Sequence, residues 1–316
     1  MKALPPCRLF VLLARDAPLG VIFRRGPTKL TQLILWHTDM DTFELGDRHV
    51  GNFYPERSDL SPDGKLLIYF AANYTARRRN KGLPDTWTAL SKPPWLRPLA
   101  LWPNFGTYYG GGLFTSNIIV QVNQDPHAHR VSEGSVDQTS WPAGKPPAEL
   151  DFPYDQLFWD HDDQFFTRME RNGWTAVEPY PSMLGPLNPD ATFTELVTGA
   201  YEAPELPVHL RSVYSKPRPG SNESLVLLWP HRSAGYYGRS ESPSYEVHDS
   251  RLKIVTSLSG AIWADWDQRG RLVYVQEGKL FTADLNIPGK FDPKEIADFT
   301  PLDKKRVRAP QSAGQW

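Results

Sequence analysis

The chain has 316 residues, of which 40% are hydrophobic and 22% charged, as in an ordinary soluble globular protein. The net charge near -1 excludes a general basic field that would attract nucleic acid or acidic lipid. A single cysteine, Cys7, excludes an intrachain disulfide and a zinc-thiolate cluster, and it is typical of a reducing compartment.

The first twenty residues predict neither a signal peptide nor a membrane span. The apolar run at residues 9–14 follows Pro5 and Pro6 and ends at Arg15, so it is too short for a secretory hydrophobic region. No later segment approaches the roughly 20 apolar residues that a membrane helix needs. We therefore expect a cytoplasmic protein without a membrane partner.

Turn formers and aromatic residues favour short strands over long helices. The chain contains 30 prolines and 23 glycines, which end regular elements, together with 11 tryptophans and 13 tyrosines, which suit a pleated surface. Residues 32–46, QLILWHTDMDTFELG, predict the first hairpin. Residues 66–91 predict a second hairpin with a longer loop, and residues 113–123 and 224–233 predict weaker copies.

Two further hairpins are expected from their turn residues. Residues 164–178, QFFTRMERNGWTAVE, are expected to fold back at Asn172-Gly173, because Asn-Gly is the strongest short hairpin signal. Residues 271–285, RLVYVQEGKLFTADL, are expected to do the same at Glu277-Gly278.

One turn-and-strand segment recurs near the other end of the chain. Residues 59–69, DLSPDGKLLIY, align without a gap with residues 265–275, DWDQRGRLVYV. Gly64 and Gly270 can take a positive φ in the turn, and the apolar residues after them predict an inner strand. We interpret Asp59 and Asp265 as carboxylates that fix the turn by accepting backbone N–H bonds.

These two segments resemble a known blade motif. Residues 58–71, SDLSPDGKLLIYFA, are similar to the Ser-Pro-Asp-Gly motif of TolB-like and tryptophan-aspartate-repeat β-propellers, and residues 264–275 resemble a degenerate copy. The resemblance implies an all-β fold, a β-propeller. Counting each expected hairpin as one blade unit gives roughly six blades, with five or seven as alternatives. We expect a single domain over residues 1–316 with a basic, mobile tail from about residue 302. A β-sandwich with a second β-domain is the competing interpretation.

Two long insertions, residues 72–86 and 124–150, are expected to emerge at the same end of the ring. Long loops in compact domains are often functional. Clustered arginines in the first insertion could bind carboxylate or phosphate, and two histidines lie in the second, although either group could simply be solvated. The predicted partner-binding residues are Tyr54, Arg57, Arg77, Arg78, Arg79, His127 and His129.

The sequence predicts a non-catalytic interaction module or a subunit of an intracellular assembly, with a protein partner and neither metal nor cofactor. A propeller fold by itself implies no activity. The alternative is a glycan-acting hydrolase or lectin-like propeller, in which Glu56, Asp160 and Asp162 would be the candidate carboxylates. A weaker alternative is a nucleic-acid accessory protein that uses the arginine run and the basic tail.

Overall fold

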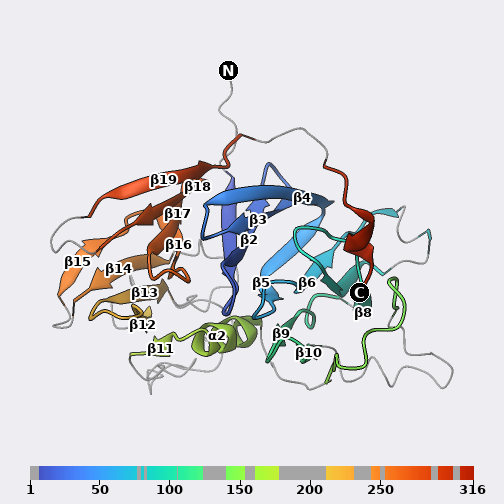
Figure 1. Ribbon diagram of the computed structural model, residues 1–316. Coiled ribbons are helices and arrows are strands. Elements are labelled where there is room, and N and C mark those ends of the chain that lie inside the picture. The colour runs from blue at the N-terminus through green and yellow to red at the C-terminus, as the bar shows by residue number, and fades with distance from the viewer. Residues whose placement is uncertain are drawn as a thin grey trace, which may run out of the picture.

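The chain folds into a series of antiparallel sheets arranged around one axis (Figure 1). The structure is a computed structural model. It describes residues 7–76, 80–81, 84–104, 106–123, 140–153, 161–177, 211–230, 243–249, 253–285, 291–301 and 307–316.

The first two sheets each contain four consecutive strands. The first is formed by β1 (Arg8–Leu13), β2 (Leu19–Arg25), β3 (Leu30–His37) and β4 (Thr42–Val50). The second is formed by β5 (Asn52–Leu60), β6 (Leu67–Ala72), β7 (Thr86–Ser91) and β8 (Ala100–Asn104). A two-stranded sheet follows, made of β9 (Gly112–Phe114) and β10 (Val120–Val122), and then the helix α2 (His161–Arg171).

A five-stranded sheet and another four-stranded sheet complete the arrangement. The five-stranded sheet contains β11 (Thr175–Ala176), β12 (Arg211–Pro217), β13 (Ser224–Pro230), β14 (Ser244–His248) and β15 (Ile254–Ser257). The last sheet contains β16 (Ala261–Trp266), β17 (Leu272–Gln276), β18 (Lys279–Ala283) and β19 (Pro293–Asp298). In every sheet the strands follow one another in chain order.

Three of the four pairs of neighbouring blades pack against each other directly, and α2 joins the remaining pair, the second and five-stranded blades. The first strands of successive sheets touch, with β1 against β5 and β16, and β5 against β9. Buried apolar clusters fill the spaces between the first and second sheets, between the first and last sheets, and between the five-stranded and last sheets. This is a β-propeller. Within the described residues it has four blades, together with the small β9–β10 sheet, so the expectation of roughly six blades is corrected.

The repeated turn forms as expected, but different side chains fix it. The amide of Gly64 donates to Ser61 at 2.8 Å and that of Gly270 donates to Asp267 at 2.8 Å, and both glycines have positive φ values, 73° and 69°. The Asp267 carboxylate accepts the amide N–H of Arg271, as the Ser61 hydroxyl does for Leu66.

Asp59 and Asp265 have another role than turn fixing. Asp59 pairs with Arg171 of α2, and Asp265 pairs with Lys216 of β12 at 2.6 Å. Each therefore ties its blade to a neighbouring element, because its carboxylate bonds to a basic side chain of that element. The interpretation of these two residues as turn-fixing carboxylates is corrected.

Residues 164–178 contain the end of a helix where a hairpin was expected. Gly173 has φ 89°, and the amide of Trp174 donates to Met169 at 3.1 Å, so Asn172-Gly173 ends α2 in a left-handed cap. The helix lies against β5 and β9 and below the ring in Figure 1. Phe166 stacks on Tyr214 of β12 at 5.2 Å between ring centres, so α2 joins the second and five-stranded blades.

In the described part of the chain, the first and last blades close the ring without sharing a strand. Arg271 lies in the β16–β17 turn of the last blade. It makes a two-point ion pair with Asp41 in the β3–β4 turn, at 2.8 and 3.0 Å. Farther along the same seam, the Arg24 guanidinium donates to the carbonyl of Phe299 at 2.7 Å. The seam therefore combines an apolar cluster with charged contacts at both ends.

The last residues of the sequence dock back onto the second blade. A short 3₁₀ helix (Gln311–Gly314) buries Ala313, and the Trp316 indole N–H donates to the carbonyl of Gly144 at 2.8 Å. Trp316 also packs on Trp141, whose ring contacts the buried Trp102. Residues 302–306, where the basic tail was expected to begin, lie outside the described residues. The segment after them, residues 307–316, ends in contact with Trp141 and Gly144.

Candidate functional site

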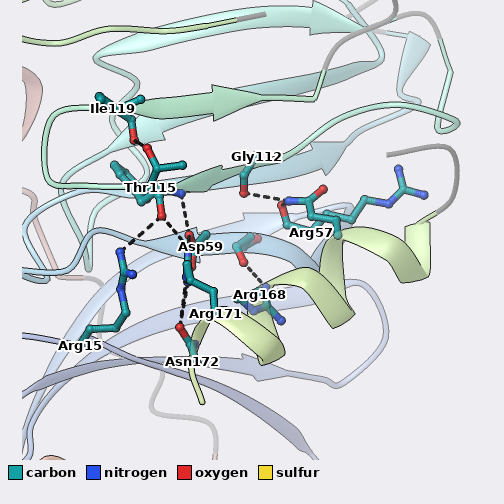
Figure 2. A network of polar contacts seen from close by, with 12 residues as sticks. Arg15, Arg57, Asp59, Gly112, Thr115, Ile119, Arg168, Arg171 and Asn172 are labelled. Carbon is teal, nitrogen blue, oxygen red and sulfur yellow. Dashed lines mark hydrogen bonds and ion pairs between the residues drawn. The ribbon is translucent and has the colours of Figure 1, made fainter. Parts of the chain in front are cut away.

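An ion pair anchors α2 to the first strand of the second blade (Figure 2). The two terminal nitrogens of Arg171 donate to the two carboxylate oxygens of Asp59, at 2.6 and 2.9 Å. The same carboxylate accepts the amide of Phe114, at 2.7 Å, and its side chain is only 3% exposed. Such charge-assisted, two-point contacts fix orientation as well as distance.

Gln164 bridges the second blade and the β9–β10 sheet. Its Nε2 donates to the carbonyls of Arg57, at 3.0 Å, and Gly112, at 2.8 Å. One side chain thus holds β5, β9 and α2 together, and this fixes the backbone of Arg57 from below.

Arg168 completes the attachment of the helix. It is buried, and its Nη1 donates to the carbonyls of Glu56 and Ser58. The guanidinium lies between the rings of Phe10 and Phe165, at 5.5 and 5.3 Å. Burial lowers the pKa of Arg168 to about 10, which still leaves it charged at neutral pH. The backbone of residues 56–58 is therefore held rigidly.

The side chain of Arg57 connects this network to the loop after β8 and to two aromatic rings. It is 5% exposed, and its Nη1 donates to the carbonyls of Thr107, at 2.7 Å, and Tyr109, at 3.3 Å. Its guanidinium lies over the rings of Tyr54 and Phe70, at 5.3 and 5.1 Å. Arg57 consequently fixes both the loop after β8 and the aromatic residues beside it.

Several tyrosines gather on this scaffold. Tyr108 is 65% exposed and Tyr74 is 46% exposed, while Tyr54 and Tyr109 are half-buried. Partial burial, followed by the proximity of Tyr54 and Asp85, raises the pKa of the Tyr74 phenol, so it remains a neutral hydrogen-bond donor. We call the four residues Tyr54, Tyr74, Tyr108 and Tyr109 the tyrosine platform. Tyrosine held by arginine is the composition typical of protein interface centres.

The described flanks of both long insertions reach this end of the ring. Ala72 and Thr86, which border the first insertion, pair with each other across β6 and β7. The amide of Asn123, which precedes the second insertion, donates to Gly111 at 2.9 Å, and the amide of Gly111 donates to the Thr88 hydroxyl at 2.8 Å. The tyrosine platform therefore lies between the two places where the insertions leave the sheets.

Only part of the predicted set can be placed. Tyr54 and Arg57 lie together at the platform, but Arg57 is turned inward onto carbonyl groups, so its observed role is to position the tyrosines. The remaining predicted residues lie outside the described residues, and their role stays a prediction: Arg77, Arg78, Arg79, His127 and His129.

Sequence reasoning missed three of the four platform residues, Tyr74, Tyr108 and Tyr109. The available signal was the pair Tyr108-Tyr109 directly before three glycines, because such glycines allow a backbone to press closely onto a neighbour.

Of the three carboxylates expected for a glycan hydrolase, only Glu56 has a described side chain. The half-exposed Glu56 lies 3.9 Å from Arg25. Asp160 and the side chain of Asp162 lie outside the described residues. Among the residues that the structure describes, no three His, Cys, Asp or Glu side chains gather in a way that could hold a metal ion.

Within the described part of the chain, no helix combines the length and apolar character required to cross a membrane.

No protein-family model matches the chain, and no curated protein matches it. Among solved structures, a match covers 92% of this chain and 85% of the β-propeller domain of the Trilobed protease from Pyrococcus furiosus, which has an open velcro topology. The two are 9% identical, with a TM-score of 0.30. At this TM-score the match carries no argument, so the fold assignment depends on the sheets and contacts described above.

Proposed function

We propose that this protein is a non-catalytic interaction module, a subunit of a larger intracellular assembly, that binds a protein partner through the tyrosine platform. The observation that carries the proposal is the exposure of Tyr74 and Tyr108 on a scaffold fixed by the buried Arg57. Large aromatic side chains supply contact area, and they lose little conformational entropy on binding when the backbone below them is already ordered.

The charge arrangement around the platform supports binding over hydrolysis. A glycosidase needs two carboxylates that face the same substrate bond. Here the buried Asp59 carboxylate is paired with Arg171, and the Glu56 carboxylate faces Arg25 at 3.9 Å. Each of these two carboxylates on β5 thus has an arginine partner, which favours a scaffold role. The blade motif similar to TolB-like and tryptophan-aspartate-repeat propellers is compatible with this role.

A pull-down with a tagged chain tests the proposal. We expect the double variant Tyr74→Ser/Tyr108→Ser to lose a stoichiometric protein partner that the wild type retains, with affinity reduced about 10- to 100-fold for two interface-centre tyrosines. Both side chains are exposed, so the melting temperature should stay unchanged.

The matched control is Ile254→Ser/Val255→Ser on β15, where the side chains are 59% and 42% exposed. This strand lies across the ring from the second blade (Figure 1). The control should keep the partner. Equal capture by the wild type and the tyrosine variant would contradict the proposal, and a glycan signal sensitive to both tyrosines would favour the lectin-like alternative.

A further inference from the structure

A groove separates the first two blades on a different part of the surface from the tyrosine platform. It has a volume of about 310 Å³ and lies between β4 and the β7–β8 hairpin. This volume is at the small end of the range for pockets that bind small molecules. The groove therefore suits a ligand with a single ring and not an extended chain.

The floor of the groove is aromatic. Trp87 and Tyr69 line it while being only 7% and 3% exposed, so each shows the groove a limited part of its ring. His49 packs edge-on against Trp87 at 5.7 Å, which fixes the orientation of the indole. Leu96 and Leu101 also line the groove and are packed against the same apolar cluster. Such walls favour an apolar, flat ligand body.

The rim carries an arginine that is held at one point. Oδ2 of Asp47 accepts the amide of Leu96, at 3.0 Å, and lies 3.3 Å from Nε of Arg97. The Asp47 carboxylate is thus already engaged, while the contact uses Nε and leaves the terminal nitrogens of Arg97 farther out. The Arg97 side chain is 57% exposed, and Arg48 also lines the groove.

The charges around the rim favour an anion. Arg48 and Arg97 outnumber Asp47, and the guanidinium fork of Arg97 matches a carboxylate in shape. We propose that this groove binds a small aromatic carboxylate, with the ring on Trp87 and Tyr69 and the carboxylate on Arg97. The site is independent of the proposed partner surface, because it shares no residue with the tyrosine platform.

A titration with 3-phenylpropionate tests the assignment, with 3-phenylpropanamide as the neutral probe of the same shape. The readout is the indole N–H signal of Trp87 in NMR spectra of the full chain labelled with ¹⁵N-tryptophan, identified by its absence in Trp87→Phe. We expect the acid to shift this signal at low millimolar concentration and the amide to bind about fivefold more weakly, since an exposed charge pair contributes modestly.

Two variants identify the contribution of the rim. Arg97→Gln should remove the preference for the acid over the amide, while the phenyl ring of either probe should still shift the Trp87 signal. Arg8→Gln, an exposed arginine elsewhere, should keep the preference. The proposal is overturned if neither probe shifts the Trp87 signal, if acid and amide bind equally, or if Arg97→Gln keeps the preference.

Discussion

At the scale of single residues, two glycines decide how closely the loop after β8 approaches the second blade. Gly110 and Gly111 have positive φ values of 123° and 91°. A Cβ on Gly110 would lie 2.3 Å from the ring of Phe70, and one on Gly111 would lie 2.1 Å from the carbonyl oxygen of Arg57. The exposed Tyr108 therefore depends on glycine at the two positions that follow Tyr109.

Gly110→Ala should destabilise the protein and disturb the tyrosine platform. The matched control is Gly106→Ala, because Gly106 also has a positive φ, 87°, but a Cβ there would meet nothing within 4 Å. Both variants share backbone strain of about 1 kcal/mol. We expect a further loss of about 1–3 kcal/mol for Gly110→Ala from the clash with Phe70. Denaturant unfolding measures the difference, and equal free energies of unfolding would contradict the close approach.

The platform could be predicted only partly from the sequence. Tyr54 and Arg57 were found because they precede a recognisable turn motif, which places them at the start of an inner strand. The inward turn of Arg57 could not be found, because it depends on carbonyls of Thr107 and Tyr109 that are about 50 residues away in the chain. Exposure of Tyr108 likewise follows from a tertiary contact and not from a local pattern.

At the scale of elements, α2 depends on polar contacts as much as on apolar packing. Its Gln164, Arg168 and Arg171 side chains all bond to β5 or to residues of β9. Phe165 and Phe166 face the five-stranded blade, with Phe165 5.0 Å from the ring of Trp229. The helix thus has one polar side toward the second blade and one aromatic side toward the next blade.

Arg171→Ala should be strongly destabilising, because it leaves the Asp59 carboxylate buried without its partner. Breaking a buried ion pair in this way costs about 3–5 kcal/mol. Glu170→Ala, which changes the adjacent exposed residue of the same helix, should change stability by less than about 0.5 kcal/mol. Denaturant unfolding and hydrogen exchange over residues 161–171 measure both effects. A loss below 1 kcal/mol for Arg171→Ala would show that the pair does not hold the helix.

The element predictions succeeded where the turn residues have one structural meaning. The hairpins at residues 32–46 and 271–285 are confirmed by the β3–β4 and β17–β18 registers. The Asn172-Gly173 prediction is wrong, because a glycine with positive φ ends a helix as readily as it turns a hairpin. The apolar spacing of Phe165, Phe166 and Met169 fits a helix, and this periodicity was the signal that could have decided between the two.

At the scale of the whole molecule, the ion pair between the first and last blades contributes to ring closure. Burial pushes the pKa of Asp41 upward, but the hydrogen bonds and charge of Arg271, with a smaller contribution from the Trp36 indole, outweigh it. The pKa of Asp41 therefore lies below its ordinary value of 3.8. The hydrogen bonds that Arg271 donates to Asp41, followed by those to Asp267, correspondingly raise the pKa of Arg271.

This shift predicts how closure responds to acid. A carboxylate with a depressed folded-state pKa stabilises the protein fully above its unfolded pKa and loses that contribution as the pH falls through the folded value. We expect Asp41→Asn to cost about 1–3 kcal/mol at neutral pH. The difference from the wild type should shrink as the pH falls below 3.8.

Denaturant unfolding at a series of pH values measures this effect. Asp39→Asn, a change to an exposed carboxylate in the same turn, is the control and should run parallel to the wild type. A constant difference between Asp41→Asn and the wild type across the acidic range would contradict the pKa argument.

The propeller architecture was predictable from the sequence, but the number of blades was not. The recurring turn at Gly64 and Gly270 correctly predicted sheets around an axis, because the same local chemistry builds the same strand pair twice. The number of blades was overestimated for a physical reason. Residues 164–178 and 113–123 were counted as blade units, but they form a helix and a two-stranded sheet that fill the space between larger blades.

Among the strands that the structure describes, each blade is built from consecutive strands, and none from one end of the sequence completes a sheet at the other. The ring is closed by side chains, such as Arg271 on Asp41 and Arg24 on Phe299. A gene segment that encodes one blade can consequently be duplicated or deleted as a unit without leaving an adjacent sheet short of a strand. Evolutionary change in the number of blades then requires only that the newly adjacent blades have sheet faces that pack against each other.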